Sequence, residues 1–183
     1  ELPMQTPLQG IPLVTHGGKV YRVGGLNARN ATAKEKEDMH SMAEFAVYDP
    51  TSGKWTDLAA LPAGRSSHDA VVIGEKLYVV GGWTLTGPRK GAWHDQAVVY
   101  DFANPEAGWT KLPAQSFRRR ALAAGEWNGK LVAMGGMDED TAISQEVNIF
   151  DPATGQWSQG PELPGDGMAG FGVSAWNLDG NLY

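Results

Sequence analysis

The sequence predicts an all-β fold built from repeated four-stranded antiparallel sheets. Three observations support this: a set of markers recurs about every 55 residues, short apolar runs alternate with turn residues between the markers, and glycine and tryptophan are frequent, at 24 and 7 of 183 residues. So much glycine without a collagen triplet indicates many tight turns. One tryptophan in each unit provides a large apolar anchor for packing.

Four markers recur in the same order in three successive units. A glycine pair ends an apolar strand, and an aromatic residue with aspartate, a tryptophan and a Leu-Pro pair follow it. The markers are Gly24-Gly25, Gly81-Gly82 and Gly135-Gly136; Tyr48-Asp49, Tyr100-Asp101 and Phe150-Asp151; Trp55, Trp109 and Trp157; and Leu61-Pro62, Leu112-Pro113 and Leu163-Pro164. A period of this length is typical of solenoids and propellers.

Each unit is expected to form four short strands. In the second unit the first three strands are expected at 70–73, 76–80 and 97–100. In each unit a turn rich in Asp, Pro, Thr and Gly then leads into the fourth strand, which carries the tryptophan. Only 31–42 has a composition suited to a helix, and we expect a loop with one helical turn there. The tryptophans and the aromatic residues before aspartate are interpreted as packing between sheets.

The four markers resemble the Kelch repeat, which joins a double glycine, a Tyr-Asp-Pro turn and a later tryptophan. The chain departs from that pattern at Asp101-Phe102, at Phe150 and in an insertion at 27–41. The resemblance implies an all-β Kelch-type β-propeller fragment of about three and a quarter four-stranded blades from a six- or seven-bladed ring. We expect repeats at roughly 11–64, 65–117 and 118–165, and the start of a further repeat at 166–183.

The glycine pairs are expected where the second strand of a blade ends against its neighbour, because a Cβ would obstruct the approach there. Both ends of the chain are expected to lie within repeats. Leu2-Pro3 matches the Leu-Pro marker, 171–176 matches a first strand, and 181–183 matches the start of a second. An open arc would leave blade faces uncovered, so we expect the remainder of the propeller from the same polypeptide or from another chain.

Composition argues against several classes of partner. A net charge of −6 and a pI near 5.1 argue against nucleic acid. The sequence lacks an apolar run long enough to span a membrane and lacks a signal-peptide pattern at its start, so localisation is undetermined and export remains open if a signal has been removed. No cysteine is present, which excludes disulfides and cysteine nucleophiles within this chain.

Two arginines occupy matching positions before first strands. Arg65 and Arg119 each lie 16 residues before a glycine pair, which places both guanidinium groups on one face, and Arg118 and Arg120 flank the second. Kelch domains that bind peptides use arginines in this loop, so the resemblance implies capture of a carboxylate or other anion. The alternative is that these arginines pair with carboxylates of neighbouring loops.

The loop after the second glycine pair adds Trp83, Trp93 and His94, a combination suited to sugars or peptides. The alternative is that both tryptophans cover the edge of the blade. The insertion at 27–41 is interpreted as an exposed loop, with a lid or a partner contact as the alternative.

Metal and cofactor chemistry have little support. The four histidines have no ligand spacing, and the acidic run 137–140 lacks the pattern of a calcium loop. Galactose oxidase, which resembles Kelch propellers, uses a cysteine-linked tyrosine that a chain without cysteine cannot provide. We therefore predict no metal and no cofactor.

The leading hypothesis is a non-catalytic recognition module that binds a protein, peptide or acidic glycan at its loop face. The alternative is a carbohydrate-active propeller resembling the sialic-acid mutarotases, in which Arg65 and Arg119 would hold a sugar carboxylate and His94 or Glu126 would move a proton. A purely structural scaffold is the third possibility, and whether the chain is an enzyme is left open.

Overall fold

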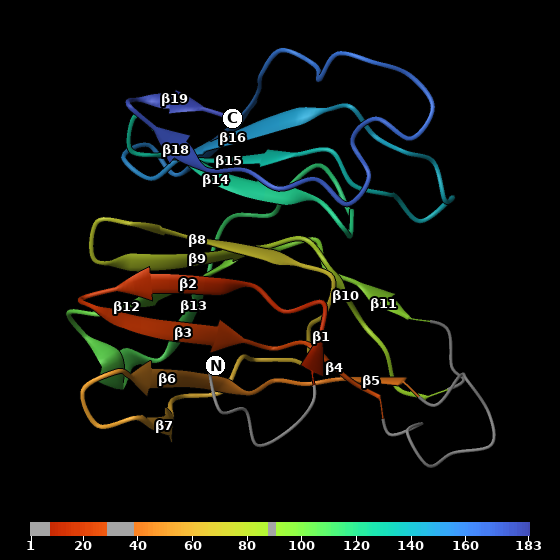
Figure 1. Cartoon of the computed structure of the whole chain (residues 1–183). Coiled ribbons are helices and arrows are strands. Elements are labelled where there is room, and N and C mark those ends of the chain that lie inside the picture. The colour runs from red at the N-terminus through yellow and green to blue at the C-terminus, as the bar shows by residue number, and fades with distance from the viewer. Residues whose placement is uncertain (1–7, 29–38, 88–90) are drawn as a thin grey trace.

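The computed structural model describes residues 8–28, 39–87 and 91–183, and it contains three four-stranded sheets (Figure 1). In each sheet the strands follow chain order and neighbours are antiparallel. Blade 1 contains β2 (Leu13–His16), β3 (Lys19–Val23), β6 (Phe45–Asp49) and β7 (Lys54–Asp57); blade 2 contains β8 (Asp69–Ile73), β9 (Lys76–Val80), β12 (Val98–Asp101) and β13 (Trp109–Lys111); blade 3 contains β14 (Ala123–Trp127), β15 (Lys130–Met134), β16 (Val147–Asp151) and β17 (Gln156–Gln159). The predicted all-β fold of four-stranded blades is confirmed.

A fourth unit begins with the hairpin of β18 (Asn177–Leu178) and β19 (Asn181–Leu182). The expectation of a first strand at 171–176 is wrong, because turns occupy 167–172 and the ladder begins only where Trp176 and Tyr183 exchange two backbone hydrogen bonds of 3.1 and 3.0 Å. The left-handed backbone of Gly170 and Gly172, with φ of 102° and 64°, bends the chain away from an extended path.

The loops that follow the second strands of blades 1 and 2 contribute to small separate sheets, and the first of these also contains a strand that precedes blade 1. One contains β1 (Leu8–Gln9), β4 (Leu26–Ala28) and β5 (Met39–Ser41), and the other is the hairpin of β10 (Trp83–Thr84) and β11 (Ala92–Trp93). Hydrogen bonds from Ser41 N to Leu85 O (2.9 Å) and from Gly87 N to Met39 O (2.8 Å) join the two. The expected helical turn within 31–42 is therefore wrong at its described end, where β5 lies, and its remainder is outside the described residues.

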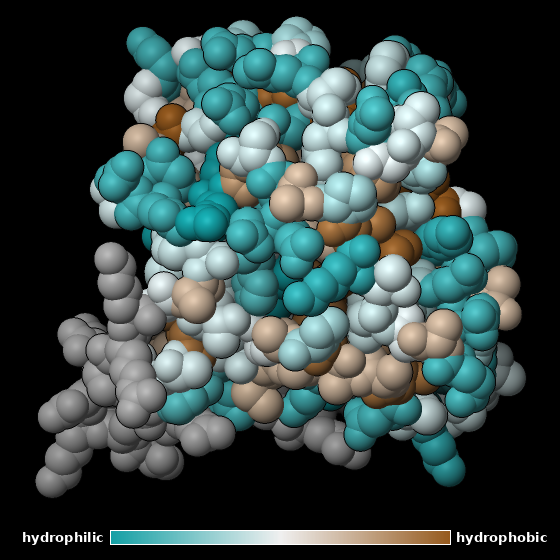
Figure 2. All heavy atoms as spheres, turned by 180° about the vertical axis from the view of Figure 1, so that it is seen from behind, coloured by the Kyte–Doolittle hydropathy of each residue, from teal (hydrophilic) through white to brown (hydrophobic). Residues whose placement is uncertain are grey.

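Helical structure is limited, in the described ranges, to a single 3₁₀ turn at Pro105–Ala107. No helix in that part of the chain has the length and hydrophobicity needed to span a membrane. The face shown in Figure 2 is largely hydrophilic, and its hydrophobic side chains are visible only in small patches.

The glycine pairs form the same contact with the following blade each time. The N–H of the second glycine donates to the carbonyl of a residue before the next first strand: Gly25 to Arg65 (2.8 Å), Gly82 to Arg119 (2.8 Å) and Gly136 to Gly170 (2.6 Å). A Cβ on Gly81 would lie 2.8 Å from Arg119 O and 2.3 Å from Leu122 Cδ2. The predicted reason for these glycines, close approach to the neighbouring blade, is confirmed.

A second ladder of hydrogen bonds between blades links the residues that lie two positions after these carbonyl acceptors. Ser67 N donates to Gly10 O (3.2 Å), Ala121 N to Ser67 O (2.8 Å) and Gly172 N to Ala121 O (2.9 Å). All four residues have left-handed backbones, with φ between 52° and 64°. Serine and alanine carry a conformational cost at such a φ, which this contact between blades offsets.

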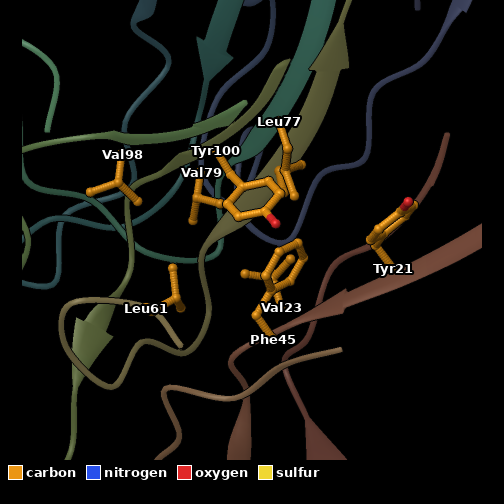
Figure 3. Close-up of a cluster of buried hydrophobic side chains, with 9 residues drawn as sticks. Tyr21, Val23, Phe45, Leu61, Leu77, Val79, Val98 and Tyr100 are labelled. Atoms are coloured by element: carbon orange, nitrogen blue, oxygen red, sulfur yellow. The ribbon is translucent and has the colours of Figure 1, made fainter. Parts of the chain in front are cut away.

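Hydrophobic clusters fill the space between blades. The cluster between blades 1 and 2, drawn in Figure 3, includes Val23, Phe45, Leu77 and Tyr100. A second cluster lies between blades 2 and 3, and a third lies between blade 3 and the β18–β19 hairpin. Each described blade therefore buries its apolar face against the next.

The tryptophans of blades 2 and 3 pack on the preceding blade, as predicted. The ring of Trp109 lies 5.0 Å from that of Phe45, and its Nε1 donates to Ala59 O at 2.8 Å. The ring of Trp157 packs at 5.5 Å on Phe117, which lies just before the first strand of blade 3, and its Nε1 donates to Pro113 O after the last strand of blade 2 at 3.3 Å.

The Gly81→Ala substitution tests the contact between blades against local backbone strain. Gly74 is the matched control, because its φ of 58° is also left-handed but a Cβ there meets nothing within 4 Å. We expect Gly74→Ala to cost about 1 kcal/mol of unfolding free energy and Gly81→Ala at least about 3 kcal/mol, because it adds a clash with the next blade. Denaturant unfolding measures both, and equal costs would contradict the contact.

Candidate functional site

The arginines, tryptophans and histidine that the sequence offers as ligand-binding residues lie at one end of the blades, which we call the loop face. It is made of the segments before the first strands and after the second strands, residues 64–68, 81–87, 91–96, 115–121 and 135–146. Backbone hydrogen bonds join the two kinds of segment within a blade, from Ser66 N to Trp83 O (3.0 Å) and from Arg120 N to Met137 O (3.0 Å). The candidate side chains nevertheless differ in exposure and contacts.

Arg65 and Arg119 occupy equivalent places, and both side chains are turned into their blades. They are 4% and 2% exposed. Arg65 Nη2 donates to Gln96 O at 3.0 Å, and Arg119 Nη1 donates to Glu146 O, the equivalent carbonyl, at 2.9 Å. Burial lowers the pKa of each arginine to about 10, so both remain charged at neutral pH.

The two guanidinium groups have different surroundings. Arg119 also bonds Ser144 Oγ (2.8 Å) and Asn148 Oδ1, and the ring of Phe117 lies 4.3 Å from its Cζ. The strand register places His94, Val98 and Ala63 at the corresponding positions around Arg65. Among the described residues, the Arg65 guanidinium group donates one other hydrogen bond, a long one of 3.4 Å from Nη1 to Val79 O. The charge of Arg65 is thus less fully compensated than that of Arg119.

A small pocket of about 170 Å³ lies beside Arg65 between blades 1 and 2. Its lining includes the small residues Pro62 and Ala63, the aromatic rings of Trp93 and His94, and the charged side chains of Asp95 and Lys111. Blade 3 has Ser116, Phe117 and Arg118 where blade 2 has Pro62, Ala63 and Gly64. The smaller side chains leave room beside Arg65 that Phe117 occupies beside Arg119.

His94 is held neutral in the wall of this pocket. Its Nε2 lies 3.0 Å from Thr84 Oγ1 and 3.4 Å from Gly64 O. The Thr84 hydroxyl donates its proton to Gly64 O, so Nε2 is the protonated ring nitrogen and donates to both oxygens. Burial, with the nearby charge of Arg65, lowers the pKa of His94 to about 4.

His68 is a further buried histidine, which the sequence did not single out. It is 6% exposed and follows Arg65 by three residues, where the other units have Ile11, Leu122 and Val173. Neither ring nitrogen has a well-formed hydrogen bond in the described part of the chain, although the backbone of Val23 lies near enough to favour the protonated ring. Burial, the charge of Arg65 and the neighbouring His94 hold its pKa well below the ordinary value.

Trp83, Trp93 and Arg120 come together on the loop face. Trp83 pairs with Trp93 across the β10–β11 hairpin, with ring centroids 5.5 Å apart. The guanidinium of Arg120 lies 4.4 Å from the centre of the Trp83 ring and donates to Met137 Sδ at 3.1 Å. Both tryptophans are partly buried, and this stack joins blade 2 to blade 3.

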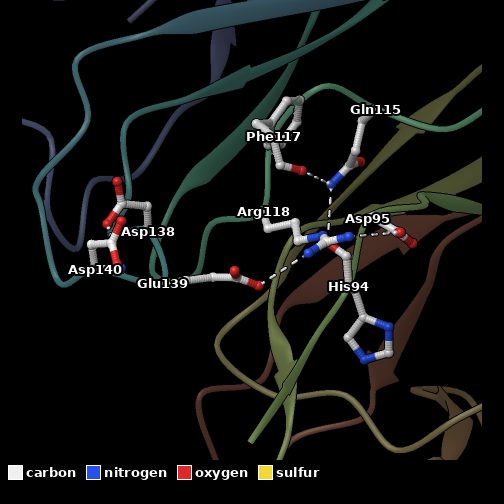
Figure 4. Close-up of polar contacts among 8 residues, drawn as sticks. All are labelled: His94, Asp95, Gln115, Phe117, Arg118, Asp138, Glu139 and Asp140. Carbon is white, nitrogen blue, oxygen red and sulfur yellow. Dashed lines mark hydrogen bonds and ion pairs between the residues drawn. The ribbon is translucent and has the colours of Figure 1, made fainter.

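Arg118 points into a second hollow, a cleft of about 470 Å³ between blades 2 and 3. Its guanidinium lies between Asp95 of blade 2 and Glu139 of blade 3, with 3.4 Å between nitrogen and oxygen in each pair (Figure 4). The three side chains are each about half exposed, at 50%, 54% and 46%. The consecutive residues Arg118, Arg119 and Arg120 thus have three separate environments.

Glu126, which the carbohydrate-active alternative offered as a proton-transfer group, lies away from the loop face. Glu126 lies near the far end of β14 from the loop face, where its carboxylate accepts hydrogen bonds from Gly129 N (2.7 Å) and Asn177 Nδ2 (3.2 Å). It is therefore not placed beside the side chains of Arg65 and Arg119, with which the carbohydrate-active alternative would combine it. No cluster of three or more potential metal ligands occurs among the described residues.

Comparison with a family model and with solved structures agrees with the repeats and the fold described above. The Kelch motif matches residues 64–103 and 118–164. The solved structure of YjhT superposes with a TM-score of 0.72 at 16% identity, over 96% of this chain and 58% of that one. At this identity the likeness concerns the fold alone.

Curated relatives carry the same repeats. Kelch repeat and BTB domain-containing protein 12 of Homo sapiens is 28% identical over 86% of this chain, and Kelch repeat and BTB domain-containing protein 13 of Homo sapiens is 35% identical over 74%. Alpha-scruin of Limulus polyphemus is 25% identical over 90%. The chain spans 26%, 28% and 17% of the lengths of these three relatives.

The buried histidines predict a loss of stability in mild acid. Both pKa values are depressed in the folded chain, so below about 6.5 the unfolded state binds more protons. Above pH 6.5 both histidines are neutral in the folded and the unfolded chain, and they do not reduce the free energy of unfolding. As the pH falls from there toward the folded pKa values, the free energy of unfolding decreases by up to about 1.4 kcal/mol per pH unit for each proton.

The His68→Leu substitution, which copies Leu122 of blade 3, should reduce this pH dependence by about one proton and leave stability at pH 7 equal or higher. Denaturant unfolding between pH 7.5 and 5 measures both effects. An unchanged slope in the variant would contradict the assignment.

Proposed function

Because the chain belongs to the Kelch-repeat proteins, which generally mediate protein interactions, we propose that it is a recognition module that binds an acidic side chain of a partner protein in the pocket beside Arg65. The observation that carries this proposal is a buried guanidinium at an open pocket. Arg65 forms no ion pair among the described residues, and the two hydrogen bonds of its guanidinium group go to carbonyl oxygens at 3.0 and 3.4 Å.

A carboxylate suits this pocket for three reasons. It compensates a desolvated charge, and a charge-assisted hydrogen bond to a guanidinium is worth about 1.5–3 kcal/mol. The volume of about 170 Å³ admits a side chain rather than a whole folded segment. Trp93 offers an apolar wall for the methylene groups of an aspartate or glutamate, and the neutral His94 does not compete for the anion.

The pocket can be closed without removing the arginine. Ala63→Phe introduces the residue that blade 3 has at this position, where Phe117 covers Arg119. Ala153→Phe is the matched control, because Ala153 lies exposed in the turn between β16 and β17. Calorimetric titration would use a five-residue peptide with a central glutamate and its glutamine counterpart.

We expect the glutamate peptide to bind at least tenfold more tightly than the glutamine peptide. Ala63→Phe should weaken binding of the glutamate peptide at least tenfold, and Ala153→Phe should leave it unchanged. Between pH 6 and 8 the affinity should be constant, because the pKa values of Arg65 and His94, about 10 and about 4, lie outside that range. Equal affinity for both peptides, or an unaltered affinity in Ala63→Phe, would rule out this site.

A further inference from the structure

The cleft between blades 2 and 3 differs in charge from the pocket beside Arg65. Five carboxylates and two guanidinium groups line it, which leaves a formal charge of −3; the carboxylates are those of Asp95, Asp138, Glu139, Asp140 and Glu146, and the guanidinium groups are those of Arg118 and Arg119. Asp138, Asp140 and Glu146 have no cation within ion-pair distance among the described residues. An excess of negative charge therefore faces the hollow.

The cleft already holds one guanidinium group weakly. Both ion pairs of Arg118 have a separation of 3.4 Å, at the long end for charge-assisted hydrogen bonds, and all three side chains are about half exposed. Exposed pairs of this kind contribute less than about 1 kcal/mol each. Arg118 can consequently leave Asp95 and Glu139 at little cost when another cation arrives.

Gln115 provides an independent indication of a ligand that donates hydrogen bonds. This side chain lines the cleft and is 6% exposed. Its Nε2 donates to Phe117 O at 3.0 Å and to His94 O at 3.3 Å, so the two carbonyls fix the orientation of the amide. Oε1 must then be the remaining acceptor, and it is buried without a partner in the described part of the chain. This acceptor is covered, and a donor that enters the cleft would satisfy it when the Gln115 side chain turns toward the ligand.

We propose that this cleft binds the basic side chain of an arginine or lysine of a partner protein, and that Arg118 occupies the place of that side chain in the free chain. Guanidinium and ammonium groups donate several hydrogen bonds and carry the charge that the carboxylates lack. A metal ion is the poorer fit, since no group of three or more potential ligands lies together among the described residues. This site is separate from the pocket beside Arg65, although Asp95 borders both.

The test uses a five-residue peptide with one central arginine and the same peptide with citrulline, an uncharged arginine analogue. Amide chemical shifts of Glu139, Asp140 and Glu146 report binding in NMR titrations of the 183-residue chain. We expect the arginine peptide to shift these amides in a saturable way, with an affinity at least fivefold higher than that of the citrulline peptide. The difference should decrease with added salt, because exposed charges are screened.

Three variants separate this site from other acidic surface. Arg118→Gln should raise the affinity for the arginine peptide at least threefold, because it releases Asp95 and Glu139. Glu139→Gln should lower it at least threefold. Asp57→Asn is the matched control, since Asp57 is an exposed carboxylate at the end of β7 outside the cleft, and it should change nothing.

The proposal would be overturned if citrulline and arginine peptides bound equally, or if Arg118→Gln weakened binding. Ala63→Phe should leave the arginine peptide unaffected, so failure of the Arg65 pocket and failure of this cleft give different results.

Discussion

The hydrogen bond from the second glycine of each pair to the carbonyl before the next first strand fixes the distance between blades. It recurs three times, at 2.8, 2.8 and 2.6 Å. Such a bond requires two backbones to approach where a Cβ would lie 2.3–2.8 Å from its neighbours, as at Gly81. The aromatic clusters between blades pack at the spacing that this contact sets, and residues of the loop face take part in the contact.

The same contact fixes the backbone of the two arginines of the loop face. The carbonyls of Arg65 and Arg119 accept these bonds, so the backbone of both residues belongs to the joint between blades. Their side chains turn back into the blade and bond the equivalent carbonyls of Gln96 and Glu146. The space beside each arginine then depends on the residues just before it, which are small before Arg65 and large before Arg119.

Much of the fold was predictable because the markers reflect packing that every blade repeats. The second strand of blade 2 was placed at its observed bounds, 76–80, and the glycine pairs were assigned their physical role. The site was less predictable. Equivalent spacing places Arg65 and Arg119 on one face, but it does not tell whether a guanidinium points to solvent or into its own blade. The joining of β5 to β10 depends on loops from two blades and has no local sequence signal. A single polar residue at an otherwise apolar position, such as His68, is only a weak sequence signal of an unusual buried group.

Hydrogen exchange of individual backbone amides tests the central claim most directly. If the joint between blades holds the arc together, the amides of Gly82 and Ala121 should exchange as slowly as those of β9 and β15, because all of them open in one cooperative transition. Their exchange at the rate of exposed loop amides, while β9 and β15 remain protected, would show that the blades are independent units and would contradict this account.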